Sequence, residues 1–194
     1  MNAAVFAAAA VLSAPFDPAT AEDSLPALSA LGPQPAGATA VTVTAGTPFH
    51  GVHLDHGLLD LLDVGVAVDL WPEGFYRPTA QARLRALRAG PAQIAVRGAV
   101  GRIFGAGAPV GRTTDGEVAI QLGLAVIPRL AIFAELSVLG STDFTREHTA
   151  GFTQVQGGLA FAPPGPISLL ASAGVLNGAR GSRAVGSGGA AFRF

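Results

Sequence analysis

The chain of 194 residues has room for one domain. Its formal net charge is −1, and its basic residues are all arginines spread along the chain, which excludes the basic patch of a nucleic-acid-binding protein. It has no cysteine, which excludes disulfides and thiolate metal ligands. The 26 glycines and 14 prolines interrupt the chain too often for long helices, so we expect an all-β protein of short strands and turns.

The first residues have the pattern of an export signal. An apolar, alanine-rich run at 3–12 is followed by the small residues Ala19, Thr20 and Ala21, which predicts a signal peptide at 1–21. The pattern lacks a basic residue ahead of the apolar run, so a short amphipathic helix that is never cleaved stays an alternative. No stretch reaches the ~18 apolar residues of a transmembrane helix, so crossing a membrane would require a closed β-barrel.

The chain changes character after the predicted signal peptide. Residues 22–37 carry three prolines among small and polar residues and show no sustained period, which predicts a periplasmic N-terminal linker. From residue 38 to residue 194 a two-residue period takes over, and we expect this part to form one barrel domain.

The two-residue period is clearest at 117–126. Val118, Ile120 and Leu122 lie on one face there, and small or polar residues occupy the other. The period and the turn residues predict ten strands, at 39–46, 49–57, 61–70, 77–88, 92–103, 116–127, 129–139, 151–162, 166–176 and 185–194. We therefore expect an up-and-down antiparallel barrel whose apolar faces meet lipid.

The connections between these strands alternate in length. The long ones lie at 104–115, 140–150 and 177–184, and the short ones at 89–91, 128 and 163–165. Short periplasmic turns and longer outer loops are typical of transmembrane barrels, and an even strand number places both termini on the periplasmic side. Segment 51–66 counts as two strands; if it were one strand and a loop, the barrel would have eight.

A soluble barrel that binds an apolar ligand is the alternative fold. In that fold large residues such as Val118 and Ile120 would point inward. Periodicity alone does not show whether the apolar faces of the strands point inward or outward. Strand lengths near the 9–11 residues that cross a bilayer favour the membrane. The aromatic girdle is thin, with Trp71, Phe75 and Tyr76 grouped at one rim.

If the alternation holds, a set of charged side chains faces the lumen. Its members are Asp63, Asp69, Arg83, Arg85, Arg97, Glu117, Glu135 and Arg193. Arginine and carboxylate groups in a narrow barrel are expected to pair, because an unpaired buried charge is costly. The pairs would fill the lumen as a plug or form a charged constriction that selects small ions or polar solutes.

Histidines and carboxylates gather densely at one place. This cluster consists of His50, His53, Asp55, His56 and Asp60. On a strand His53 and Asp55 share one face and His50 and His56 the other, so only two converge, whereas a metal or catalytic site needs at least a third group. The other such cluster, Glu147 and His148, lies in an outer loop. We therefore expect no catalytic, metal or cofactor site.

The chain ends on an alternating, aromatic-terminated segment. Ser187 and Arg193 would face inward and Phe192 and Phe194 would face lipid. The four residues Ser187, Gly189, Phe192 and Phe194 resemble the C-terminal assembly signal of bacterial outer-membrane β-barrel proteins. This resemblance implies the outer membrane of a Gram-negative cell, contact with its lipid, and insertion by the barrel-assembly machinery.

Together these patterns predict a small, porin-like outer-membrane barrel. Its expected function is a structural or adhesion scaffold, or a narrow transport pore with a largely plugged lumen. Any specificity would lie in the outer loops, and the sequence identifies no extracellular or periplasmic partner. We expect no enzyme activity; the alternative is a barrel enzyme acting on lipid or peptide.

Overall fold

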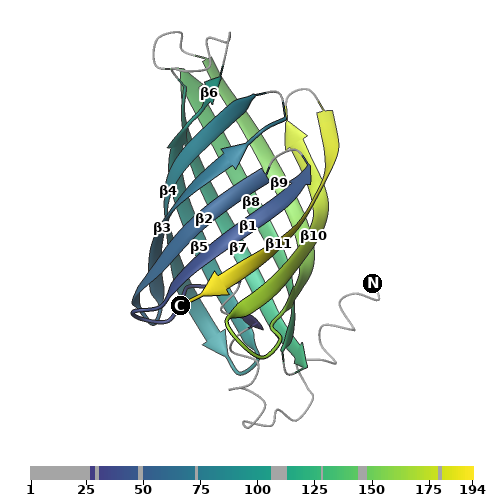
Figure 1. Ribbon diagram of the computed structural model, residues 1–194. Coiled ribbons are helices and arrows are strands. Elements are labelled where there is room, and N and C mark those ends of the chain that lie inside the picture. The colour runs from purple at the N-terminus through teal and green to yellow at the C-terminus, as the bar shows by residue number, and fades with distance from the viewer. Residues whose placement is uncertain are drawn as a thin grey trace.

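The protein is a closed antiparallel β-barrel of ten strands (Figure 1). This computed structural model describes residues 27–28, 31–47, 50–72, 74–105, 113–127, 129–143, 148–178 and 181–194. The wall consists of β1 (Thr39–Thr47), β2 (His50–Leu59), β3 (Leu62–Leu70), β4 (Phe75–Ala89), β5 (Ala92–Arg102), β7 (Thr113–Ile127), β8 (Leu130–Asp143), β9 (His148–Phe161), β10 (Ile167–Gly178) and β11 (Gly181–Arg193). The two-residue strand β6 (Phe104–Gly105) continues β5 along β4. The predicted fold class is confirmed.

The barrel closes by pairing its first strand with its last. Successive wall strands pair antiparallel throughout, and β1 pairs with β11. At the end of this seam Thr39 and Phe194 exchange two backbone hydrogen bonds of 3.0 Å. The eight-stranded alternative is wrong, because β2 and β3 are separate strands joined by a turn at Asp60 and Leu61.

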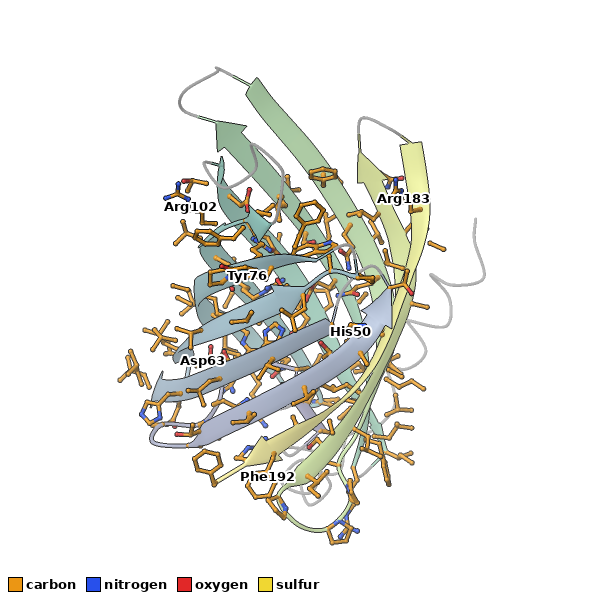
Figure 2. The ribbon with its side chains drawn as sticks, turned by 45° about the horizontal axis from the view of Figure 1, so that its top comes forward. His50, Asp63, Tyr76, Arg102, Arg183 and Phe192 are labelled. Carbon is orange, nitrogen blue, oxygen red and sulfur yellow. The ribbon has the colours of Figure 1, made fainter. Side chains whose placement is uncertain are left out.

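Side chains alternate between the two sides of the wall, as the pleat of a strand requires. On β7 the exposed fractions of Val118, Ile120 and Leu122 are 58%, 46% and 49%, whereas Ala119 between them is buried. Figure 2 shows the side chains that cover the outside of the barrel. The outer surface is therefore the apolar one, and the alternative in which these residues line an interior is wrong.

Several strands extend beyond the predicted bounds at the end of the barrel opposite Thr39 and Phe194, which the predicted topology makes the outer rim. The hairpin of β10 and β11 continues to the pair Gly178–Gly181, so the long connection expected at 177–184 is wrong. The pairing of β7 with β8 likewise reaches Thr113 and Asp143. Glycine and polar residues extend these strands because the ladder is made of backbone hydrogen bonds, which do not require an apolar side chain.

Ahead of β1 the chain lies inside one end of the barrel, the end that the predicted topology places on the periplasmic side. This N-terminal segment, residues 27–28 and 31–38, leads into β1 through backbone hydrogen bonds that join Gly37 and Ala38 to Gly57. Leu28 and Leu31 are buried, with exposed fractions of 1% and 3%. Within the described residues no helix is both long and apolar enough to cross a membrane.

Candidate functional site in the barrel lumen

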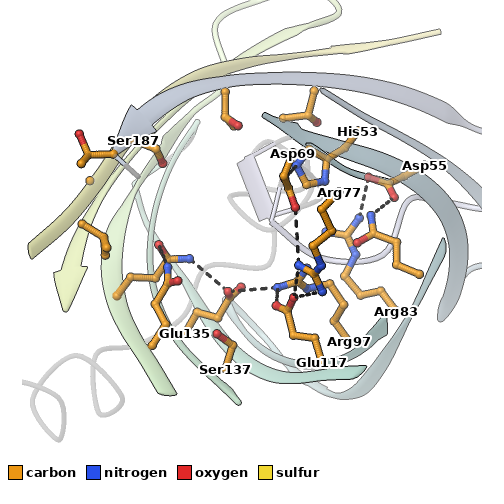
Figure 3. A pocket seen from close by; sticks show the side chains of 18 of the residues that line it. His53, Asp55, Asp69, Arg77, Arg83, Arg97, Glu117, Glu135, Ser137 and Ser187 are labelled. Atoms are coloured by element: carbon orange, nitrogen blue, oxygen red, sulfur yellow. Dashed lines mark hydrogen bonds and ion pairs between the residues drawn. The ribbon is translucent and has the colours of Figure 1, made fainter. Parts of the chain in front are cut away.

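Six neighbouring strands supply a wall of paired charges to the lumen (Figure 3). We call the ion-paired residues of these strands the charged wall: Asp55, Asp63, Asp69, Arg77, Arg83, Arg97, Asp115, Glu117 and Glu135. Arg77 lies at its outer end, where Nη1 and Nη2 both donate to Glu117 Oε2 at 3.2 Å. The same guanidinium lies 3.6 Å from Asp69 and 3.5 Å from Asp115. One arginine therefore holds three carboxylates.

Arg97 of β5 continues the charged wall. Arg97 Nη2 lies 2.6 Å from Glu117 and 3.5 Å from Glu135. These contacts couple Arg97 to Arg77 through the shared carboxylate of Glu117.

Toward the periplasmic end, Arg83 is the third arginine of the charged wall, and it also contacts two carboxylates. Its Nη2 lies 2.9 Å from Asp63 and 3.3 Å from Asp55. Asp55 also accepts a hydrogen bond of 2.7 Å from Gln81. The planar guanidinium suits these arrangements because it presents several donors in a fixed geometry.

The opposite side of the lumen carries hydroxyl and amide groups. Ser172 and Ser187 share a hydrogen bond of 2.9 Å between their hydroxyls, and Gln154 donates to Gln156 at 3.1 Å. Gln156 then donates to Glu135 at 3.1 Å, which joins this neutral wall to the charged wall. Between the two walls lies a polar cavity of about 220 Å³.

A second, apolar cavity of about 300 Å³ lies at the outer end of the lumen. We call it the vestibule. Its apolar lining consists of Trp71, Phe75, Ile103, Leu139, Phe152 and Leu176. Arg77, Glu117, Ser137 and Gln154 line both cavities, so these four residues separate the vestibule from the polar cavity.

The N-terminal segment fills the other end of the lumen. Leu28 and Leu31 pack in one cluster with the wall residues Ala131, Ala160 and Ala162. Its backbone carbonyls accept hydrogen bonds from lumenal side chains: Gln93 donates to Leu28 at 3.0 Å, Arg83 to Leu31 at 3.2 Å and Arg85 to Pro33 at 3.0 Å.

Two further bonds fix the segment near Gln34. Asp63 accepts a bond of 2.8 Å from the Gln34 amide, and Arg193 donates to the Gln34 side chain at 3.1 Å. Nearer the rim, Asp60 accepts a bond of 3.2 Å from the Ala36 amide. Residues 31–34, assigned to a linker from sequence, are thus buried against the barrel's inner surface, and residues 35–37 are exposed at the rim.

The eight charged residues selected from sequence divide between two tasks. Asp63, Asp69, Arg83, Arg97, Glu117 and Glu135 belong to the ion pairs of the charged wall. Arg85 and Arg193 contact the N-terminal segment, and Asp63 and Arg83 do both.

Sequence reasoning missed three members of the charged wall. Arg77 and Asp115 fell at or beyond predicted strand ends, although Arg77 shares its face with Arg83, and Asp115 with Glu117. Asp55 was considered only with the histidines. The parity of residue numbers along each strand was the signal that identified the others.

The histidine cluster separates across the wall. His53 faces the lumen 3.9 Å from Asp69, whereas His50 and His56 are exposed. His56 shares a hydrogen bond of 2.8 Å with Thr39. Glu147 lies outside the described residues, and no side-chain placement is described for His148. Among the described residues no group of three or more candidate ligands is placed to hold a metal ion.

Three residues of the expected assembly signal lie on the last strand, and Phe194 directly follows it. Ser187 faces the lumen, and Phe192 lies on the exposed side of β11 near the end of the barrel (Figure 2). The rings of Phe192 and Phe194 lie 5.9 Å apart. Their recognition by the barrel-assembly machinery stays a prediction.

Neither a protein-family model nor a curated protein sequence matches the chain. Solved structures do resemble it. A bacterial polysaccharide outer membrane secretin matches with a TM-score of 0.50 and 12% identity over 78% of this chain and 57% of its own. The NanC porin matches with a TM-score of 0.46 and 11% identity over 79% of this chain and 98% of its own.

An outer membrane protein of Vibrio cholerae, a loop-deletion mutant of OmpT, matches with a TM-score of 0.45 and 14% identity over 75% of this chain and 53% of its own. The chain thus spans little more than half the length of this protein and of the secretin. At these identities the comparisons concern the fold alone, and that fold is the one found in outer-membrane β-barrel proteins.

Proposed function

We propose that the protein is a narrow outer-membrane pore for small polar solutes, closed at its periplasmic mouth by its own N-terminal segment. The observation that supports this proposal is the polar cavity of about 220 Å³ at mid-lumen. A barrel that served only as a scaffold would gain stability from a lumen packed without voids. Here charged, hydroxyl and amide groups surround a space instead.

The charge balance of the charged wall favours cations. The charged wall contains the carboxylates of Asp55, Asp63, Asp69, Asp115, Glu117 and Glu135. Among the described residues Arg77, Arg83 and Arg97 pair with them, so within the charged wall six carboxylates stand against three guanidiniums. Arg85 and Arg193, which contact the N-terminal segment, reduce the difference over the whole lumen to six against five. Rings of acidic side chains select cations in channels, and a negative excess acts in the same direction here.

A structural or adhesion scaffold is the second candidate. It is favoured by ion pairs that tie the adjacent strands β3 and β4 and β5 and β7 together, and by one that joins β4 to β7 across β5, all of which brace the wall. In that case displacing the N-terminal segment would leave the barrel non-conducting. The two candidates therefore differ in a measurable current.

The test is conductance in planar bilayers for a pair of variants. The first is the double variant Leu28→Asp, Leu31→Asp, which places two charges in the apolar contact with Ala131 and Ala160. The control is Leu28→Met, Leu31→Met, which keeps this contact apolar. We expect the Asp pair to produce small, cation-preferring current steps. The wild type and the Met pair should stay closed.

Folding of every variant is checked by the mobility shift of the unboiled protein in electrophoresis. A folded Asp pair that carries no current would support the scaffold. Large, non-selective steps would contradict the narrow lumen.

A further inference from the structure

We propose that the vestibule is a binding site for a single-chain amphiphile with a cationic head, such as a primary alkyl amine. The chain would occupy the apolar cavity, and the ammonium group would meet Glu117, the carboxylate among the residues that line its floor. This assignment goes beyond the pore function and does not depend on whether the lumen conducts.

The vestibule has the size and lining of a ligand site. Its volume of about 300 Å³ is at the lower end of the range for small-molecule pockets. Apolar side chains from β4, β8, β9 and β10, together with Trp71 and Ile103, surround this space, while polar groups appear only at the floor. An apolar chamber with a few polar groups at one end matches a ligand that is itself apolar with one polar end.

Two aromatic rings of the vestibule lie over glycines of neighbouring strands. Phe75 pairs across the ladder with Gly105, and Phe152 with Gly178. A Cβ atom at Gly178 would lie 2.7 Å from the Phe152 ring, and one at Gly105 would overlap the Phe75 ring. The glycines therefore allow both rings to lie close to the wall, which leaves the centre of the vestibule open.

The floor carries an excess of negative charge. Arg77 contacts Asp69, Asp115 and Glu117, and Arg97 contacts Glu117 and Glu135. Arg77 and Glu117 line the floor itself, and the other four groups lie behind them. At and behind the floor, two guanidiniums therefore face four carboxylates. An added ammonium group lowers this excess, whereas an added carboxylate raises it, so the charge of the head decides the affinity.

The chain contains a natural reporter of this site. Trp71 is its only tryptophan, and it lines the vestibule. Emission from the intact protein in zwitterionic lipid nanodiscs therefore reports on this cavity. The experiment titrates decylammonium, decanoate and decanol separately into the same preparation.

We expect decylammonium to change Trp71 emission saturably and to bind at least tenfold more tightly than decanoate. Equal affinities for all three amphiphiles, or a change that rises linearly as in lipid partitioning, would overturn the proposal.

A matched pair of variants locates the chain of the ligand. Leu176 lines the vestibule on β10, and Leu170 packs near the N-terminal segment on the same strand. Leu176→Asn should weaken decylammonium binding about tenfold, because a polar group replaces apolar lining. Leu170→Asn should leave it unchanged, and an equal effect of both would overturn the location.

Glu117→Gln tests the head group without altering the vestibule's apolar lining. It should weaken decylammonium binding several-fold and leave decanol binding unchanged. The mobility shift on boiling verifies that each variant is folded, and decanol binding shows that the chamber is intact. Unchanged decylammonium binding in a folded Glu117→Gln protein would contradict the floor as the site of the cation.

Discussion

The two ends of the lumen have similar lining but different contents. At the periplasmic end, apolar wall residues cover Leu28 and Leu31 of the same chain, and arginines donate to its backbone carbonyls. At the outer end, apolar side chains again stand over paired charges, but they enclose a cavity. The difference indicates that one end has an occupant encoded in the chain, whereas the other is shaped for a molecule from outside.

The largest effect is expected from removing the arginine between the two cavities. Arg77→Ala leaves Asp69, Asp115 and Glu117 without their shared partner in a buried setting. The free energy of unfolding should fall by about 3–5 kcal/mol. Urea titration followed by the electrophoretic mobility shift measures it.

Arg88→Ala is the control for this substitution, because Arg88 lies on the same strand with an exposed side chain. Its effect should stay within about 0.5 kcal/mol. Equal losses for the two variants would contradict a stabilising role of the charged wall.

A smaller effect is expected at the contact between β2 and the N-terminal segment. A Cβ atom at Gly57 would overlap the backbone oxygen of Pro35, so Gly57→Val should displace the segment and raise the open fraction of the pore. Gly98 has open space around its Cβ position, and Gly98→Val is the matched control. Bilayer recordings of both proteins distinguish displacement from a general effect of valine. A closed Gly57→Val protein would contradict closure by this contact.

The smallest effect is expected on the neutral wall. Ser172→Ala removes one hydroxyl pair with Ser187, and the typical net value of such a hydrogen bond is about 1 kcal/mol. The unfolding midpoint should move slightly, and closure should be unaffected because neither serine contacts the N-terminal segment in the hydrogen bonds described. A loss as large as that of Arg77→Ala would show that the two walls contribute equally.

The direction of most side chains in the barrel wall was predictable, because it depends on the local two-residue period of the sequence. The two-residue period determines which residues face outward, so Val118 and Phe192 were placed correctly on the exposed side, and Glu117 and Arg97 in the lumen. Rim residues such as Asp115 were harder to place, because strand ends there are extended by backbone pairing without an apolar pattern.

The contents of the lumen were not predictable in the same way. The path of residues 31–37 depends on Arg83, Arg85 and Gln93, which lie more than fifty positions away in the chain. Phe75 and Trp71 resembled a lipid-facing girdle with Tyr76, yet they line the vestibule, and only Tyr76 is exposed. Such contacts depend on how the barrel closes, which no local period reports.

The most direct test of the account is the current carried by the Leu28→Asp, Leu31→Asp protein beside its Leu28→Met, Leu31→Met control. Closure by the N-terminal segment predicts small, cation-preferring steps in the first protein and a closed barrel in the second. A folded Asp variant that remains as silent as the control would contradict the claim that this segment closes a pore.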